Sequence, residues 1–151
     1  MITTPPSVPT DFCLRLARAH ALLIRRFDSA LGNHHGISFG DYQVLNHLAR
    51  APGGRLRRVD LAERLGLTAS GVTRTLLPLE KIGLVTREAD PSDARVGFAA
   101  ITPTGEELLL NASVTADQVS AELLKPIDAD QLAGITDLLG QLAGLAVPPA
   151  P

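Results

Sequence analysis

Small polar side chains and one arginine are concentrated in a short stretch near the middle of the chain. Residues 68–74 read T-A-S-G-V-T-R. Hydroxyl groups and a guanidinium can hydrogen-bond to base edges or phosphates, and small side chains let a helix approach a DNA groove closely. For Thr68 and Ser70, capping of a helix N-terminus is an alternative role. The candidate DNA contacts in this stretch are Thr68, Ala69, Ser70, Gly71, Thr73 and Arg74.

The distribution of charge supports a nucleic-acid partner, although the net charge of −2 does not. Residues 50–95 contain nine Arg or Lys against six Asp or Glu, a local charge of +3, whereas the remainder carries −5. This asymmetry is typical of a basic DNA-facing module on an acidic scaffold. Within the basic region, the candidate phosphate contacts are Arg57, Arg58 and Arg87, with a solvated surface as the alternative role.

The pattern around the polar stretch predicts a helix–turn–helix over Val59–Lys81. A short first helix is expected up to Leu65, and Gly66 can adopt the positive φ of the turn. A second helix follows, with its apolar residues at three- and four-residue spacing on one face. Pro78 lacks an N–H group, so we expect a kink or a break there. Only the front of the second helix, about residues 68–75, would then read DNA.

Two β-type runs follow the second helix, at residues 84–88 and 96–101. They flank the turn-forming residues of 89–95, which predicts a two-stranded hairpin with a polar tip. Residues 55–58 could add a short strand. A helix–turn–helix followed by such a hairpin is a winged helix–turn–helix, expected over about residues 38–101.

Apolar-striped helices are predicted on both sides of this module, over about residues 11–31 and 103–146. The expected helix boundaries are a stop at Gly32, a capping-box-like start at Ser38, and N-terminal caps at Thr102 and Asp128. These helices exceed what the winged module needs for its own core. Surplus apolar faces are usually buried between subunits, so we predict a two-fold symmetric homodimer. The predicted fold is mainly α with a small β-hairpin wing, as a single domain over 11–146. Residues 1–10 and 147–151 are expected to be disordered tails.

Several classes of protein are disfavoured by composition. The single cysteine, Cys13, excludes an internal disulfide framework and fits a reducing cytosol. The N-terminus lacks the pattern of a signal peptide, and no apolar run is long enough to span a membrane. We therefore expect a cytoplasmic protein without a membrane partner. No catalytic constellation can be placed on one site, so we expect neither an enzyme nor a cofactor.

In this order of elements, the chain resembles the multiple-antibiotic-resistance regulator (MarR) family. The resemblance covers nearly the whole chain. It implies that the second helix of the motif lies in the major groove and that Arg95, at the wing tip, enters the adjacent minor groove. Asp93 would orient Arg95, with a local salt bridge as the alternative role for the pair. The motifs that carry the resemblance are L-A-E-R-L-G-L-T at 61–68, S-G-V-T-R at 70–74, L-E-K-I-G-L-V at 79–85 and D-A-R-V-G-F-A-A-I-T-P-T-G at 93–105.

The resemblance also implies a regulatory signal. The common one in the family is a small effector, often an aromatic or phenolic anion, that relieves operator binding. A second hypothesis is a thiol-based redox sensor acting through Cys13, although Phe27 and Phe39 stand where that branch has tyrosines. The alternative for Cys13 is a small buried hydrophobe. Zinc sensing is disfavoured because the histidines lack metal-ligand spacing. A winged-helix adaptor that binds protein and not DNA is the alternative from another functional class.

Overall fold

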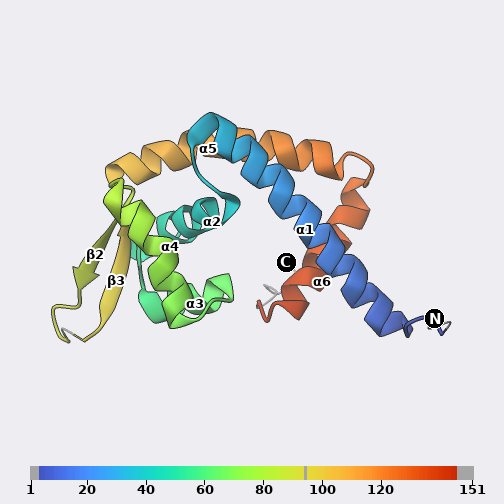
Figure 1. Cartoon of the computed structure of the whole chain (residues 1–151), viewed down its shortest axis with the longest axis horizontal. Helices are drawn as coiled ribbons and strands as arrows, with labels where there is room; N and C mark the ends of the chain where they lie inside the picture. The colour runs from blue at the N-terminus through green and yellow to red at the C-terminus, as the bar shows by residue number, and fades with distance from the viewer. Residues whose placement is uncertain (1–3, 94, 146–151) are drawn as a thin grey trace. The chain divides into compact units, whose positions relative to one another are not determined.

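The computed structural model describes residues 4–93 and 95–145 of the 151-residue chain, and its elements are drawn in Figure 1. The described residues divide into two compact units, the first ending at Ala116 and the second beginning at Asp117. None of the described helices is long and apolar enough to cross a membrane. The elements are α1 (Val8–His35), α2 (Phe39–Ala49), a 3-10 turn η1 (Pro52–Gly54), β1 (Arg55–Arg57), α3 (Arg58–Leu65), α4 (Ala69–Lys81), β2 (Val85–Ala89), β3 (Gly97–Ile101), α5 (Pro103–Leu124) and α6 (Ala129–Leu142).

Helix α1 is longer than predicted at both ends. It begins at Val8, within the stretch predicted as a disordered tail, and Ser7 is its N-cap residue. It passes through Gly32, where we expected it to stop, and ends at Gly36. Gly36 has a φ of +68° and its N–H donates to the Gly32 carbonyl, which is the left-handed end that glycine adopts most easily.

The core of the first unit lies where α2, α3 and α4 meet. Its largest fully buried side chains include leucines from all three helices, and Leu31 extends the core to the end of α1. The predicted capping box at the start of α2 is confirmed. The Ser38 hydroxyl accepts from the Asp41 N–H at 3.0 Å, and the Asp41 carboxylate accepts from the Ser38 N–H at 2.9 Å. These two hydrogen bonds therefore fix the residue at which α2 begins.

The wing is an antiparallel three-stranded sheet in the order β1-β3-β2. Strands β2 and β3 form the predicted hairpin, with Val85 opposite Ile101 and Ala89 opposite Gly97. The short run at 55–57 pairs with the other edge of β3. Ala99 and Ala100 are buried, and because successive strand residues point to opposite faces, both faces of the central strand are covered at this point.

Helices α5 and α6 begin at the predicted caps. The Thr102 hydroxyl accepts from the Gly105 N–H at 3.1 Å, and the Asp128 carboxylate accepts from the Gln131 N–H at 2.9 Å. The apolar stripe of α6 remains uncovered, because Ile135, Leu138 and Leu142 are exposed and none of the helix's residues is buried.

Candidate nucleic-acid interface

The turn between α3 and α4 has the geometry of a helix–turn–helix. Gly66 ends α3 with a φ of +64°, and the Leu67 N–H donates to the Ala62 carbonyl. The Thr68 hydroxyl then accepts from the Gly71 N–H at 3.1 Å, which makes Thr68, and not Ser70, the N-cap of α4. A Cβ on Gly71 would lie 3.3 Å from that hydroxyl oxygen. Gly71 therefore leaves room for the cap.

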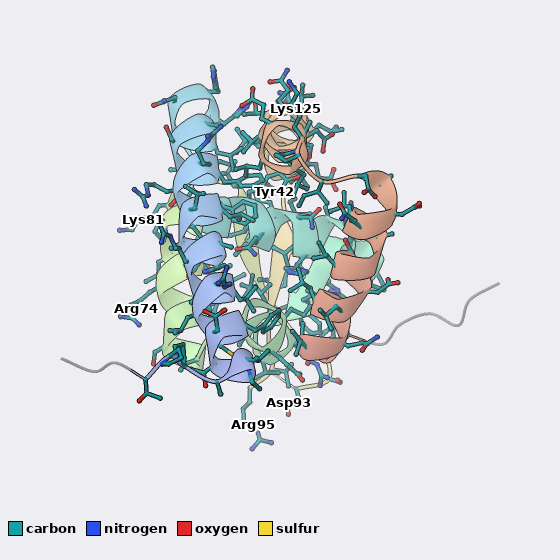
Figure 2. The ribbon with its side chains drawn as sticks, turned by 90° about the vertical axis from the view of Figure 1, so that its right-hand side faces the viewer. Tyr42, Arg74, Lys81, Asp93, Arg95 and Lys125 are labelled. Carbon is teal, nitrogen blue, oxygen red and sulfur yellow. The ribbon has the colours of Figure 1, made fainter. Side chains whose placement is uncertain are left out.

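Helix α4 has one buried face and one open face. Val72, Leu76 and Leu79 are almost fully buried. Ala69 and Ser70 are exposed at its first turn, and Arg74 is exposed one turn further on. Figure 2 shows Arg74 and Lys81 pointing away from the protein on the same side. The open face thus combines small residues at its front with two cations further along.

Pro78 does not break α4, although a break was one of the two outcomes we expected there. The helix continues to Lys81, and its N–H capping bonds follow at Ile82 and Gly83. Proline cannot donate a hydrogen bond to the Arg74 carbonyl, and this costs stability. Leu76 and Leu79, on either side of Pro78, are buried and hold the helix in place. Because the helix continues, Lys81 joins the open face, which the sequence interpretation had limited to residues 68–75.

The Thr73 hydroxyl makes two hydrogen bonds within the protein, which its sequence position did not indicate. Its hydroxyl donates to the Ala69 carbonyl at 3.1 Å and accepts from Arg58 Nη2 at 2.9 Å. One acceptor lone pair is left for DNA, since a hydroxyl has one donor and two acceptor positions. Ala69, Ser70 and Arg74 are therefore the more accessible of the predicted contacts.

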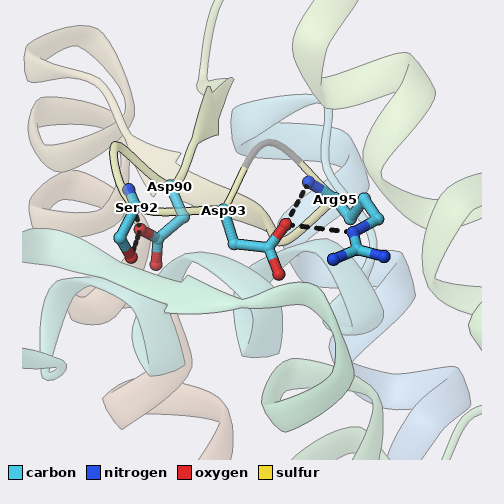
Figure 3. A network of polar contacts seen from close by, with 4 residues as sticks. All are labelled: Asp90, Ser92, Asp93 and Arg95. Carbon is cyan, nitrogen blue, oxygen red and sulfur yellow. Dashed lines mark hydrogen bonds and ion pairs between the residues drawn. The ribbon is translucent and has the colours of Figure 1, made fainter.

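The wing tip is organised by two short-range carboxylate contacts, drawn in Figure 3. Asp93 Oδ1 accepts from the Arg95 N–H at 3.0 Å and lies 3.3 Å from Arg95 Nε. Asp90 accepts from the side chain and the N–H of Ser92, and these two bonds lower the pKa of its carboxyl. The Arg95 side chain is 92% exposed. Its guanidinium projects beyond the wing in Figure 2, oriented but open to solvent.

The other predicted phosphate contacts differ in how they are held. Arg57 Nε lies 2.9 Å from Asp60 Oδ2 across the start of α3, so its charge is partly compensated. Arg87 is exposed on β2. Arg58, the third candidate phosphate contact, lies against α4, where its Nη2 donates to Thr73 Oγ1 at 2.9 Å. Burial, and secondly the charge of Arg87, lower the pKa of its guanidinium, while Glu80 acts in the opposite direction.

Cys13 lies exposed on α1, so the interpretation as a buried hydrophobe is wrong for the single chain. The redox hypothesis gains no support either. The Phe27 and Phe39 rings pack with centroids 4.2 Å apart and carry no hydroxyl. Tyr42, the one tyrosine, places its hydroxyl 3.2 Å from Ser113 Oγ. Across residues 4–93 and 95–145, no three His, Cys, Asp or Glu side chains are grouped so that they could hold a metal ion.

Comparison with known proteins gives a consistent result. A model described as "MarR family" matches residues 35–96. Transcriptional regulator HosA of Escherichia coli O111:H- is 33% identical over 90 residues, which are 60% of this chain and 65% of that protein. The chain thus spans less than two thirds of that relative's length.

Two solved structures from Streptomyces coelicolor share the fold. Sco3205, a MarR family transcriptional regulator determined in complex with DNA, is 26% identical with a TM-score of 0.84, over 96% of both chains. The PcaV transcriptional regulator, determined in complex with its natural ligand, is 28% identical with a TM-score of 0.75, over 95% of this chain and 98% of that one. The relatives are regulators and not enzymes.

Proposed function

We propose that the chain is a member of the MarR family and a DNA-binding transcriptional regulator that acts as a homodimer on a pseudo-palindromic operator. Helix α4 lies in the major groove and Arg95 enters the adjacent minor groove. The observation that carries this proposal is the open face of α4, with Arg74 and Lys81 exposed beside a wing whose tip arginine is 92% exposed. The DNA complex of Sco3205, which shares the fold over 96% of this chain, supports the same partner.

The uncovered apolar residues support the homodimer. Helix α1 exposes Phe12, Leu14 and Leu22, and α6 exposes Leu138 and Leu142. Contiguous apolar faces of this kind are rare on monomeric proteins and are usually covered by another subunit. A second copy of the chain is the simplest cover, and it places two recognition helices about a two-fold axis. Equilibrium sedimentation should give a dimer mass; a monomer at micromolar concentration would contradict this part of the proposal.

An effector that relieves operator binding, making the protein a repressor, completes the proposal. A cavity of about 370 Å³ lies between α2 and the start of α5, lined among others by Arg50, Leu109 and Ser113. Its volume falls within the range of small-molecule sites, and Arg50 supplies a cation for an aromatic or phenolic anion. PcaV, with a similar fold, was determined with its natural ligand.

Binding to duplex DNA is the decisive test. Fluorescence anisotropy with duplexes selected by the protein from a random pool should show tight binding that weakens steeply with salt, because phosphate neutralisation releases counterions. The selected half-sites should lie about 10 bp apart, one helical turn, as the two-fold axis requires. Absence of duplex binding at low salt would reject this function and leave the winged-helix adaptor.

The effector is tested by thermal shift with a panel of phenolic acids, since a ligand that binds only the folded state raises the melting temperature. The expected hit also releases the protein from its selected duplex. An Arg50→Ala variant should lose most of the shift, whereas Arg25→Ala on α1 should retain it. A hit whose shift is the same in all three proteins would exclude the α2–α5 cavity.

A further inference from the structure

A small hollow opens between the wing and the start of α3. Its volume is about 280 Å³, and three arginines from separate segments line it: Arg58 at the start of α3, Arg87 on β2 and Arg95 after the wing turn. The remaining wall includes Gly97 of β3. We call this feature the arginine hollow. Three arginines and one acid, Glu88, line this small space, so its wall carries a net positive charge.

Arg58 is fixed in the hollow by contacts with α4 and β3. Its Nη2 donates to Thr73 Oγ1 at 2.9 Å, and its Nη1 lies 3.5 Å from Glu80 Oε1. A Cβ on Gly97 would stand 3.1 Å from Arg58 Cδ, so the glycine makes room for the arginine stem. The Arg58 side chain is only 17% exposed, which leaves little freedom to reorient. The cation is therefore pre-ordered.

The charge in the hollow is only partly compensated. Arg58 Nη1 is buried without a hydrogen-bond partner among the described residues, so its pairing with Glu80 is a loose ion pair. Glu88, the acid of the hollow wall, accepts from Arg55 at 3.1 Å, and Asp93 lies against Arg95. Burial, and secondly repulsion from the charge of Arg87, lower the pKa of the Arg58 guanidinium. An anion in the hollow would relieve this repulsion between like charges.

The position of the hollow indicates that its anion is a phosphate of the DNA backbone. Arg58 is bonded to Thr73 on the groove-facing helix, and Arg95 belongs to the wing tip. A protein that places one element in the major groove and the next in the adjacent minor groove must cross the sugar–phosphate backbone between them. The space between α4 and the wing is that crossing point. Planar guanidinium groups also match the geometry of phosphate oxygens.

We propose that the arginine hollow binds one backbone phosphodiester of duplex DNA and so fixes the spacing between α4 and the wing. This inference rests on the proposed function and adds a subsite to it. Arg87 supplies the open donor, and Arg95 remains the minor-groove contact at the edge of the hollow. Arg58 acts as a positioning residue, because its bond to Thr73 ties the phosphate subsite to the recognition helix.

The first experiment replaces single phosphates of a selected duplex by uncharged methylphosphonates and measures anisotropy with wild-type protein and Arg87→Gln. Arg87 is exposed, so its variant keeps the fold. Replacement of one particular phosphate in each half-site should weaken duplex binding by wild type about tenfold. The same replacement should hardly change duplex binding by Arg87→Gln. The slope of log K against log salt should fall by about 0.9 for each phosphate that the protein no longer neutralises. Arg25→Gln, which removes a distant exposed arginine of α1, should behave as wild type.

The outcomes separate this inference from the proposed function. If wild type binds duplex DNA but every methylphosphonate affects wild type and Arg87→Gln equally, the subsite is wrong and the function stands. If wild type binds no duplex, the function itself fails. A second arm follows arginine Nε–Hε NMR signals during titration with inorganic phosphate at constant ionic strength. Saturation below millimolar phosphate would assign the hollow to a free anion and overturn the backbone assignment; weak, unsaturated shifts support it.

Discussion

Substitution of Gly105 by alanine should destabilise the protein, although Gly105 lies in a helix. It is the third residue of α5, directly behind the sheet. A Cβ there would overlap the Leu84 carbonyl oxygen and lie 2.9 Å from Ile101 Cγ1, an approach that real Cβ atoms essentially never show. The Leu84 carbonyl cannot simply retreat, because it accepts the Thr102 N–H at 3.1 Å. Alanine must therefore displace α5 from the sheet.

Two opposing effects set the size of the loss. Alanine is better than glycine in a helix interior by about 1 kcal/mol, which favours the variant. Overpacking of a tight contact costs roughly 1–3 kcal/mol, and more where backbone must move. The obstacle here is a backbone carbonyl that is already hydrogen-bonded, so the upper end applies. We expect a net loss of about 2 kcal/mol or more, a large part of the roughly 5–15 kcal/mol of a typical domain.

Urea unfolding followed by circular dichroism at a fixed protomer concentration measures this loss. Gly32→Ala is the matched control, since Gly32 lies within α1 and a Cβ there would meet no atom within 4 Å. It should stabilise the protein by up to about 1 kcal/mol. If Gly105→Ala shifted the midpoint in the same direction and by the same amount as Gly32→Ala, the steric reasoning about the start of α5 would be refuted.

Three further substitutions test the interface and its support. Arg95→Ala should weaken duplex binding in anisotropy at least tenfold while changing unfolding free energy by less than about 0.5 kcal/mol, because its side chain is exposed; unchanged affinity would remove it from the interface. Thr68→Ala should cost about 1 kcal/mol in urea unfolding by loss of the α4 cap, and Thr68→Ser should restore most of it; equal losses would contradict capping. Burial, then Arg64 and Arg50, lower the pKa of His47, so the folded state binds this proton less tightly than the unfolded state. The contribution of neutral His47 to the unfolding free energy should therefore be fully present above about pH 6.5 and be lost as the pH drops below it. His47→Gln should flatten that loss, and an unaltered pH profile would exclude His47 as its source.

Local chemistry explains which parts of the fold could be predicted from the sequence. The caps at Ser38, Thr68, Thr102 and Asp128 depend on residues three positions away, so their signals are contained in short stretches. The wing hairpin likewise depends on turn-forming residues between two β-type runs. The errors at α1 came from treating Gly32 as a stop. A glycine ends a helix only where the chain adopts positive φ, and Gly36 does so.

Tertiary contacts explain what sequence reasoning missed. Pro78 carries a strong local signal for a break, but burial of Leu76 and Leu79 outweighs it and brings Lys81 onto the open face. Arg58 is one of three candidate phosphate contacts, but nothing local indicated that it would contact α4. Its role comes from Thr73 and Glu80, which lie 15 and 22 positions later, and from Gly97 on a strand. Such contacts are set by packing and not by spacing.

Thr102 joins the end of the recognition helix to the start of α5. Its hydroxyl donates to the Gly83 carbonyl at 2.6 Å, just beyond α4, and accepts from the Gly105 N–H within α5. Its N–H donates to the Leu84 carbonyl, which is the atom that Gly105 must approach. A displacement of the first turn of α5 is therefore transmitted to the C-terminal end of α4 through hydrogen bonds of one residue. Leu109, on the next turn of α5, lines the cavity proposed for the effector, so these hydrogen bonds connect that cavity with the helix proposed to contact DNA.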